Sequence, residues 1–335
     1  MAGGGTARTQ DRVSQPVPDR PEQEAAAARV SVSERKALLF ANVASRQGAM
    51  DLAPALELLR DGGVRVLDER APDVRQLGAW ILEHRSEADL VIIGGGDGTL
   101  NAAAEALVEA GLPLGILPLG TANDLARTLE IPTDLIEASR VIADGHSRRI
   151  DLGSVNGKHF FNVASMGLSV HVARQLRVDV KRRWGVLGYT LTLWRALGRH
   201  RSFRAEIRCN GARARVRTMQ ISVGNGRHYG GGMTIAADAA IDDGMLDVVS
   251  VAPQGLLELI VNLPALRWGW HEGAERVRHW RAREIKIRTV RSLPINTDGE
   301  VTTRTPADIV VVPKALAVYV PRTFVASLEA DDVAG

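Results

Sequence analysis

The chain has 335 residues, of which 45% are hydrophobic and 24% charged, as in an ordinary globular protein, and its length favours two domains over one core. Its single cysteine, Cys209, excludes an internal disulfide, and no apolar run reaches the roughly 18–20 residues that span a bilayer. The net charge is +3, so the distribution of basic residues matters more than their excess. The N-terminus lacks the apolar core of a secretory signal. Residues 1–33 are expected to form a disordered tail, with a second tail at 323–335.

Residues 34–150 alternate apolar strands with helical segments, which predicts an α/β domain with a doubly wound parallel sheet. Residues 151–322 instead show short alternating runs between turn pairs such as Asn156-Gly157, which predicts a mostly antiparallel β-sandwich whose last strands could return to the first domain. Helical insertions are expected at 170–197 and 255–275. The expected strands are 37–43, 64–67, 90–93, 114–119, 149–155, 160–164, 205–209, 219–223, 246–251, 284–288 and 317–320, and the expected helices of the first domain are 52–61, 74–85, 100–110 and one from 125.

The most informative stretch runs from Leu90 to Asn101, where a buried strand meets a loop with four glycines and then an alanine-rich helix. The backbone N–H groups of such a loop, with a helix N-terminus, suit a phosphate group. The loop has neither the ending of a Walker A sequence nor the spacing of the dinucleotide fingerprint, and a plain tight turn is the alternative. Asp97 favours a site, because a carboxylate in such a loop suits a metal ion that accompanies phosphate.

A second polar loop, residues 120–124, follows the next strand and therefore belongs to the same sheet edge. Its Thr, Asn and Asp residues are good helix caps, but a helix needs only one. We therefore expect Thr121 and Asn123 to contact phosphate or ribose. Asp124 is expected to share a Mg²⁺–water network with Asp97.

Two acidic turns in the second half are further candidates. Residues 240–247 hold three carboxylates that could bind a cation together with backbone carbonyls, although Asp-Gly turns are also routine. Asp298-Gly299-Glu300 is expected either as a plain hairpin turn or as two carboxylates of which one faces a substrate hydroxyl as a base. The glycines around Tyr229 are expected to be hairpin turns. No spacing typical of a zinc site or of a Ser–His–Asp nucleophile is present.

A basic belt covers residues 174–217, where many arginines stand against only Asp179 and Glu206. Within it, residues 184–197 are rich in Trp and Leu. A basic aromatic helix over 174–201 suits the surface of an anionic membrane, and a core helix with solvated arginines is the alternative. Nucleic acid is not an expected partner, because the aromatic residues are mixed with bulky aliphatic ones.

Taken together, these motifs resemble a known family. Residues 94–101 resemble the GGDGT signature of the diacylglycerol kinase catalytic domain, and residues 117–126 are similar to its second block. The glycines of 225–232, the turn at 240–247 and the Asp-Gly-Glu turn follow in the family's order. The resemblance covers about residues 36–322 and is closest to the soluble bacterial lipid kinases, relatives of sphingosine and ceramide kinases.

The resemblance implies transfer of the γ-phosphoryl group of ATP, with Mg²⁺, to the hydroxyl of a diacylglycerol-like or sphingoid lipid. It also implies an α/β domain followed by a β-sandwich, with the active site between them. Asp97 and Asp124 would serve the catalytic magnesium, and Asp298 or Glu300 would be the base. A second, structural Mg²⁺ is implied at Ala240, Asp243 and Met245. The implied nucleotide contacts are Gly95, Gly96, Asp97, Gly98, Thr99, Leu100, Asn101, Thr121 and Asn123.

Two other functions stay open. A soluble NAD kinase-like enzyme shares Gly-Gly-Asp-Gly but needs neither the second block nor the basic aromatic helix, and a non-catalytic nucleotide-binding regulator would not need all four acidic site residues. Residues 67–70 lack the threonine that family members often use for nucleotide, so ATP itself is not fixed by the sequence. We expect a cytoplasmic enzyme of phospholipid metabolism at a membrane surface. Whether it forms a homodimer is left open.

Overall fold

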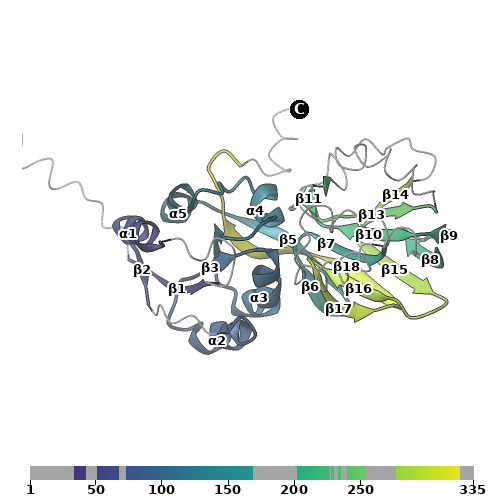
Figure 1. Cartoon of the computed structure of the whole chain (residues 1–335), viewed down its shortest axis with the longest axis horizontal. Helices are drawn as coiled ribbons and strands as arrows, with labels where there is room; N and C mark the ends of the chain where they lie inside the picture. Colours follow the sequence, from purple (N-terminus) through teal and green to yellow (C-terminus); the bar gives the residue numbers. More distant parts are fainter. Residues whose placement is uncertain are drawn as a thin grey trace, which may run out of the picture. The chain divides into compact units, whose positions relative to one another are not determined.

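The computed structural model describes residues 34–42, 51–67, 73–168, 202–226, 228–229, 233–234, 240–253 and 277–324 (Figure 1). The predicted tails, the basic aromatic helix at 174–201, the insertion at 255–275 and the glycines at 230–232 lie outside these residues, apart from residues 323–324. Among the residues described, no helix is long and apolar enough to cross a membrane.

The first half of the fold is a parallel sheet with helices on both faces. Its strands are β1 (Arg35–Ala41), β2 (Val64–Val66), β3 (Leu90–Gly95) and β4 (Leu114–Pro118), and its helices are α1 (Ala53–Asp61), α2 (Leu77–His84), α3 (Asp97–Ala110), α4 (Asp124–Thr128) and α5 (Leu135–Ala143). The strands lie in the order β2-β1-β3-β4, with α1 and α5 on one face and α2 and α3 on the other (Figure 1). The strand order reverses between β1 and β3, and α/β sheets bind ligands at the carboxyl ends of strands at such a point.

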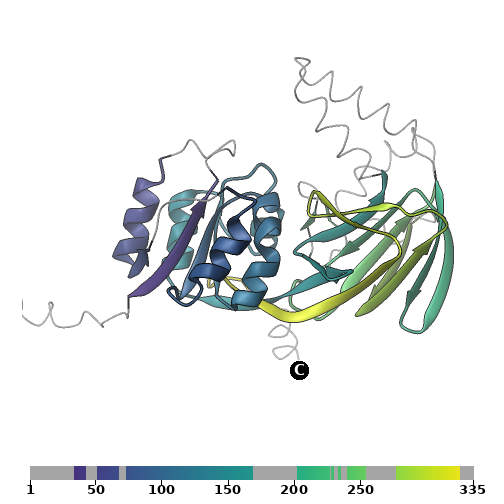
Figure 2. The ribbon, with the colours of Figure 1, turned by 90° about the horizontal axis from the view of Figure 1, so that it is seen from below.

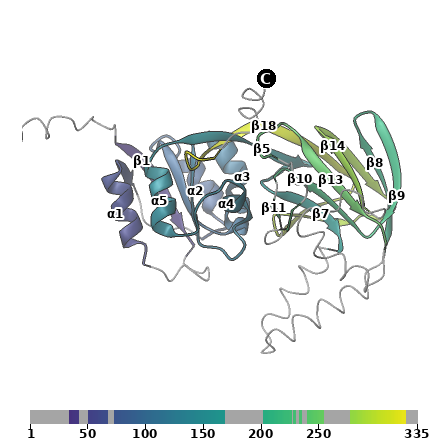
Figure 3. The ribbon, with the colours of Figure 1, turned by 90° about the horizontal axis from the view of Figure 1, so that it is seen from above.

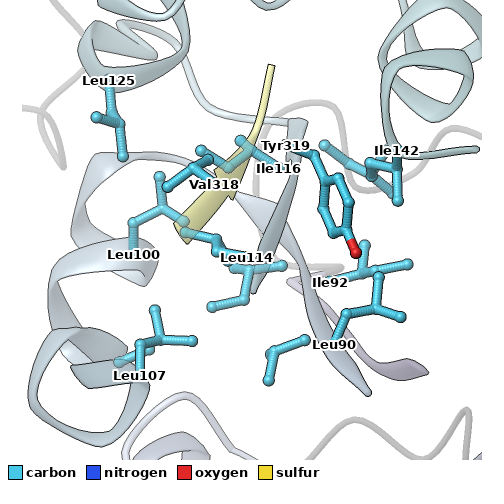
Figure 4. Packing of buried hydrophobic residues seen from close by; sticks show 14 of the residues in the cluster. Leu90, Ile92, Leu100, Leu107, Leu114, Ile116, Leu125, Ile142, Val318 and Tyr319 are labelled. Carbon is cyan, nitrogen blue, oxygen red and sulfur yellow. The ribbon is translucent and has the colours of Figure 1, made fainter. Parts of the chain in front are cut away.

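Buried side chains from this sheet and its helices form one hydrophobic core. Leu90 and Ile92 of β3 and Leu114 of β4 are fully buried, and Leu107 of α3 packs into the same cluster (Figure 4). Each such side chain contributes about 1.5–3 kcal/mol relative to an exposed one. The glycine loop that follows β3 is therefore anchored in the most buried part of the domain.

The second half is a β-sandwich. One of its sheets has the antiparallel order β14-β13-β10-β7-β16-β17, and the other continues the first sheet through β18, β15, β8 and β9. Together with the α/β half, this confirms the predicted fold class. The additional strands are β5 (Ser147–Val155), β6 (Lys158–Phe160), β7 (Val163–Gly167), β8 (Phe203–Cys209), β9 (Ala212–Thr218), β10 (Gln220–Gly224), β11 (His228–Tyr229), β12 (Met233–Thr234), β13 (Leu246–Val251), β14 (Val277–Ala282), β15 (Glu284–Thr289), β16 (Pro294–Thr297), β17 (Glu300–Arg304) and β18 (Ala307–Tyr319).

Strand β18 joins the two halves. It pairs with β15 at its start, with β5 along most of its length and in parallel with β4 at its end, so one ten-stranded sheet includes strands of both (Figures 2 and 3). The register shifts between Val312 and Leu316, where Lys314 has a left-handed backbone. The buried carboxylate of Asp151 accepts the Lys314 N–H at 2.7 Å and the Gly244 N–H at 2.6 Å, which holds this irregular stretch in place.

Several elements differ from the sequence prediction, which contained no helix at 135–143 and no strand at 277–282. Helix α3 begins at Asp97 and not near Leu100, because β3 continues to Gly95 and leaves Gly96 as the only linking residue. Strand β9 was not predicted, since its outward positions are arginines and its inward ones are small or β-branched. Strand β18 covers 307–319, where only 317–320 was predicted.

Candidate active site

The two predicted polar loops touch one another. A Cβ atom on Gly120 would lie 2.4 Å from the Cα of Gly96, and one on Gly96 would lie 2.9 Å from the Cα of Gly120. No side chain fits between the two backbones, so glycine is required at both positions. The structure thus brings together residues that lie more than twenty positions apart, at the carboxyl ends of β3 and β4.

The first turn of α3 is open toward solvent. Its N-cap is Gly96, and no side chain caps the helix. The Thr99 N–H donates to the Gly96 carbonyl at 2.9 Å, which leaves the N–H groups of Asp97 and Gly98 to suit an anion. Gly98 is exposed, and a Cβ there would meet nothing within 4 Å. The glycine at position 98 is therefore not explained by packing, whereas those at 96 and 120 are.

Asn42, which sequence reasoning missed, connects β1 to this turn. Its backbone N–H donates to the Gly94 carbonyl at 2.8 Å, and its side-chain amide donates to the Thr99 hydroxyl at 3.2 Å. Thr99 is buried. Position 95 requires glycine, because a Cβ there would lie 2.7 Å from the side chain of Thr99. Thr99 and Leu100 therefore pack inward. The sequence placed Asn42 inside an apolar strand and gave no sign of this contact.

The second loop is shaped by Asn123. Its Oδ1 accepts the Gly120 N–H at 2.9 Å and its Nδ2 donates to the Gly120 carbonyl at 3.0 Å, while its backbone is left-handed. Thr121 is exposed and Asp124 is buried at the start of α4. Asp97 accepts the Leu125 N–H at 3.2 Å, so its carboxylate connects the first loop to α4. The amide of Asn123 is thus engaged within its own loop.

Asp298 lies in a hairpin turn and points into the protein. Asp298 and Gly299 both have left-handed backbones between β16 and β17, and Asp298 is only 8% exposed. Its carboxylate accepts three backbone N–H groups, from Phe161 at 2.6 Å, Asn162 at 3.0 Å and Val163 at 2.9 Å. Burial raises the pKa of Asp298 to about 7, against the three donors, which lower it, and nearby Asp97 raises it further.

Helix α3 reaches this hairpin through Asn101. The Nδ2 of Asn101 donates to the Thr297 carbonyl at 3.4 Å, and its Oδ1 is buried without a partner among the described residues. Asp97 stands one helical turn earlier, on the same side of α3. Glu300, at the start of β17, is half-buried, two residues after Asp298. The structure therefore places Asp97, Asn101 and Asp298 in one neighbourhood, with Glu300 close by in the chain.

The donor set near α3 fits Mg²⁺, which prefers carboxylate and carbonyl oxygens: Asp97 supplies one and the unpartnered Oδ1 of Asn101 another. In the described part of the chain, however, no cluster of three or more His, Cys, Asp or Glu side chains could hold a metal by itself. Any ion at this position would need oxygens from the nucleotide or from water as well.

At the second implied magnesium site, the carboxylate of Asp243 is already engaged by protein groups. The carboxylate of Asp243 accepts the N–H groups of Ala240 at 3.2 Å and Met245 at 2.8 Å, and it forms an ion pair with Arg281. Burial raises the pKa of Asp243, and the Arg281 guanidinium opposes that effect. The cation beside Asp243 is thus an arginine of β14, which the resemblance did not anticipate.

Comparison with known proteins assigns the chain to a family. Residues 36–155 match the diacylglycerol kinase catalytic domain, and residues 162–320 match the YegS C-terminal NAD kinase beta sandwich-like domain. A YegS-like lipid kinase from Klebsiella pneumoniae is 32% identical over 277 residues, which are 81% of this chain and 91% of the relative. The diacylglycerol kinase of Bacillus subtilis is 32% identical over 240 residues, 70% of this chain and 79% of the relative. A crystal structure from Bacillus anthracis, provisionally assigned as a diacylglycerol kinase, superposes with a TM-score of 0.75 at 27% identity, covering 89% of this chain and 99% of that one.

The fold and the matches define a class, the phosphotransferases with an alcohol group as acceptor. Within that class the chain belongs to the diacylglycerol kinase catalytic-domain family, in the branch that carries a YegS-type C-terminal sandwich. The family inferred from the glycine loop and the four later motifs is therefore confirmed.

Proposed function

We propose that this protein is an ATP-dependent lipid kinase that transfers the γ-phosphoryl group to the hydroxyl of a diacylglycerol-like or sphingoid lipid. The observation that carries the proposal is the contact between the two glycine loops, with Asp298 in the neighbourhood of Asp97. Uncapped helix N-termini suit anions, and this one lies with Asp97 at the edge of the sheet where α/β proteins bind their ligands. The arrangement supports a bound phosphate donor, and the Asp-Gly-Glu turn beside it offers a carboxylate to receive a proton.

At the phosphate end, the uncapped N–H groups of α3 would bind the phosphates of the nucleotide, and Gly98 would let them approach closely. The first loop carries no lysine that could offset the charge of the transferring group. When bound, Mg²⁺ would supply that charge compensation, with Asp97 and Asn101 as its protein oxygens and Asp124 nearby in the second loop. Thr121 is exposed in the second loop, and we assign it a contact to the nucleotide.

At the acceptor end, we assign the base to Glu300 and not to Asp298. Both oxygens of Asp298 accept backbone N–H groups from residues 161–163, so this carboxylate organises the chain around it. Glu300 is half-buried and lies on the strand that follows the turn. It would orient the lipid hydroxyl and take its proton, a role that typically contributes about 10²–10⁴-fold in rate.

Transfer of radiolabelled γ-phosphate from ATP to a panel of lipids in mixed micelles, with Mg²⁺ and with NAD as a soluble acceptor, tests the proposal. We expect a labelled lipid that is lost in Glu300→Gln but kept in the exposed control Asp308→Asn. Label in NADP would support an NAD kinase-like enzyme instead. Intact ATP binding with no labelled product would support a non-catalytic regulator.

A further inference from the structure

The outer face of strands β15, β8 and β9, here called the basic sheet face, is an array of positive charge. Side chains alternate along these strands, and the inward ones, such as Ile207, Ile285 and Ile287, are fully buried in the sandwich core. A shift by one residue would expose that core, so the outward set is fixed by the fold. The outward set consists of Arg204, Glu206, Arg208, Arg213, Arg215, Arg217, Glu284, Lys286 and Arg288.

Several like charges face each other directly across this sheet. Arg204 is paired with Arg217 across β8 and β9, and Arg208 stands between Arg213 and Lys286. Like charges directly opposite one another destabilise a sheet. Glu206 bridges Arg208 and Arg213, but no residue that the structure describes bridges the other two pairs in this way. Folding therefore gains nothing from the latter two pairs, which favours an explanation outside the fold.

Carboxylates on and beside the face balance only part of this charge. Glu206 is shared by Arg208 at 2.8 Å, Arg213 and Arg215 at 3.6 Å, and its pKa is lowered to about 2, mainly by its bond to Arg213. Among the described residues, the carboxylates that oppose the seven basic side chains are Glu206 and Glu284 on the face and Asp308 of β18, which pairs with Arg288. The face therefore keeps a net positive charge.

Two depressions adjoin this face, the first around the β8–β9 turn and the second among the outward side chains of the three strands. A depression of about 770 Å³ is lined by Arg208, Arg213, Arg283 and Lys286, among others, and it lies on this sheet and not beside the glycine loops. A second, of about 490 Å³, is lined by residues that include Arg204, Arg215, Arg217 and Arg288. Val290, at the rim of the second, is 86% exposed. Each depression is thus lined by four cations and one glutamate among other residues, and the second has an exposed apolar side chain at its edge.

We propose that the basic sheet face binds the headgroups of an anionic lipid bilayer. Its charge requires an extended anionic partner, and a second copy presenting the same face would repel it. A nucleic acid fits less well, because no aromatic side chain stands outward on the face to stack on bases. The exposed Val290 suits the boundary between headgroups and acyl chains. In the sequence, β8 follows directly after the Trp- and Leu-rich stretch 184–197, for which membrane contact was also predicted.

This inference deepens the proposed lipid kinase function by naming the surface that meets the membrane, but it does not require phosphoryl transfer. Binding to vesicles and turnover in mixed micelles can be measured separately. A protein that binds vesicles but phosphorylates no lipid would refute the kinase and leave this proposal standing. A protein that phosphorylates lipid in micelles but does not bind anionic vesicles would refute this proposal and leave the kinase standing.

The test is cosedimentation of the full chain with vesicles of phosphatidylcholine alone or mixed with phosphatidylglycerol. The variant Arg204→Gln/Arg217→Gln removes two cations that face each other, so it breaks no ion pair on the face. Each basic residue near an anionic surface is worth about fivefold in binding, so we expect about 25-fold weaker binding to the anionic vesicles. The control Arg60→Gln/Arg65→Gln lowers the net charge equally on exposed residues of the α/β half and should bind as the wild type does.

Binding that requires phosphatidylglycerol, weakens at high salt and is lost in the face variant but not in the control would support the proposal. If the face variant does not fold, Arg215→Gln/Lys286→Gln serves the same purpose. Equal binding by face variant and control would overturn the proposal. So would equal binding to both vesicle types, or binding to single-stranded RNA with none to vesicles.

Discussion

Adding one methyl group at Gly98 or at Gly120 should have opposite effects on the stability of this protein. Gly98 lies in the first turn of α3 with no atom within 4 Å of an added Cβ. Alanine is the better helix former by about 0.5–1 kcal/mol, so Gly98→Ala should stabilise the fold slightly. At Gly120 the added Cβ would stand 2.4 Å from a backbone atom of Gly96 and 2.6 Å from Oδ1 of Asn123.

The clash at Gly120 cannot be relieved by rotating a side chain, because its first partner is backbone. Contacts between carbon atoms are favourable at about 3.5–4.0 Å, so the overlap exceeds an ångström. Overpacking of this kind costs about 1–3 kcal/mol or more. One kcal/mol lowers the Tm of a large domain by about 2–4 °C, so Gly120→Ala should melt several degrees below the wild type. Gly98→Ala should show a small rise in Tm instead.

Nucleotide affinity should fall in both variants, and this separates function from stability. In Gly98→Ala the new methyl group occupies the open space over the uncapped N–H groups, where a phosphate would approach. Thermal melts paired with calorimetric titration of Mg²⁺–ATP measure both quantities. If Gly98→Ala bound ATP as tightly as the wild type, the assignment of this turn to phosphate would be wrong. If Gly120→Ala melted like the wild type, the contact between the loops would be wrong.

Three further predictions concern carboxylates. Because the pKa of Asp298 is raised to about 7 in the folded state, its contribution to stability is full below about pH 4 and is lost as the pH rises through 7. The free energy of unfolding should therefore fall by about 3 kcal/mol between pH 5 and 8. Denaturant titrations should show this loss in the wild type and not in Asp298→Asn. Glu300→Gln should lower kcat by about 10²–10⁴-fold with an unchanged Tm, and a variant with normal turnover would exclude Glu300 as the base. Since Arg281 is the cation beside Asp243, EDTA should leave the Tm of the nucleotide-free protein unchanged. Arg281→Met should lower the stability by about 1–3 kcal/mol, because Asp243 then lacks its counter-charge. A wild-type protein that melts several degrees lower in EDTA would contradict this prediction.

The α/β half was predictable because each of its signals is local. Continuous apolar runs gave the parallel strands, and the glycine loop marked where β3 turns into α3. The start of α3 was placed too late, since Gly98 is a poor helix former and was counted with the loop. Its place is the first turn of the helix, where an uncapped N–H can serve a ligand.

The β-sandwich was less predictable because its strands depend on partners far away. Strand β9 carries arginine at alternate positions, and only its pairing with β8 shows that Val216 and Ala214 face a core. The left-handed residue Lys314 interrupts the alternation of β18, so only the last part of that strand stood out. Neither feature has a local signature.

The candidate site shows the same division. Its glycines and carboxylates were found by motif, but their bonds join positions far apart, as from Asn101 to Thr297 and from Asp298 to Phe161. In a sequence, an aspartate before a glycine looks the same whether it faces solvent or the interior. The left-handed turn at Asp298 decides this, because it directs the carboxylate toward three backbone N–H groups.

Asp151 and Asp298 bind distant backbone segments in the same way, and this bears on how the site is assembled. Each is a buried carboxylate that accepts backbone N–H groups from segments distant in sequence, Asp151 from Gly244 and Lys314 and Asp298 from residues 161–163. Several such bonds to one side chain fix the backbone of these segments without a metal ion. Asp151 stabilises the strand pairing that crosses between the two halves, and Asp298 stabilises the segment that meets α3. The aspartate of the Asp-Gly-Glu turn is thus explained by architecture, which is the reason the base was proposed to be Glu300 and not Asp298.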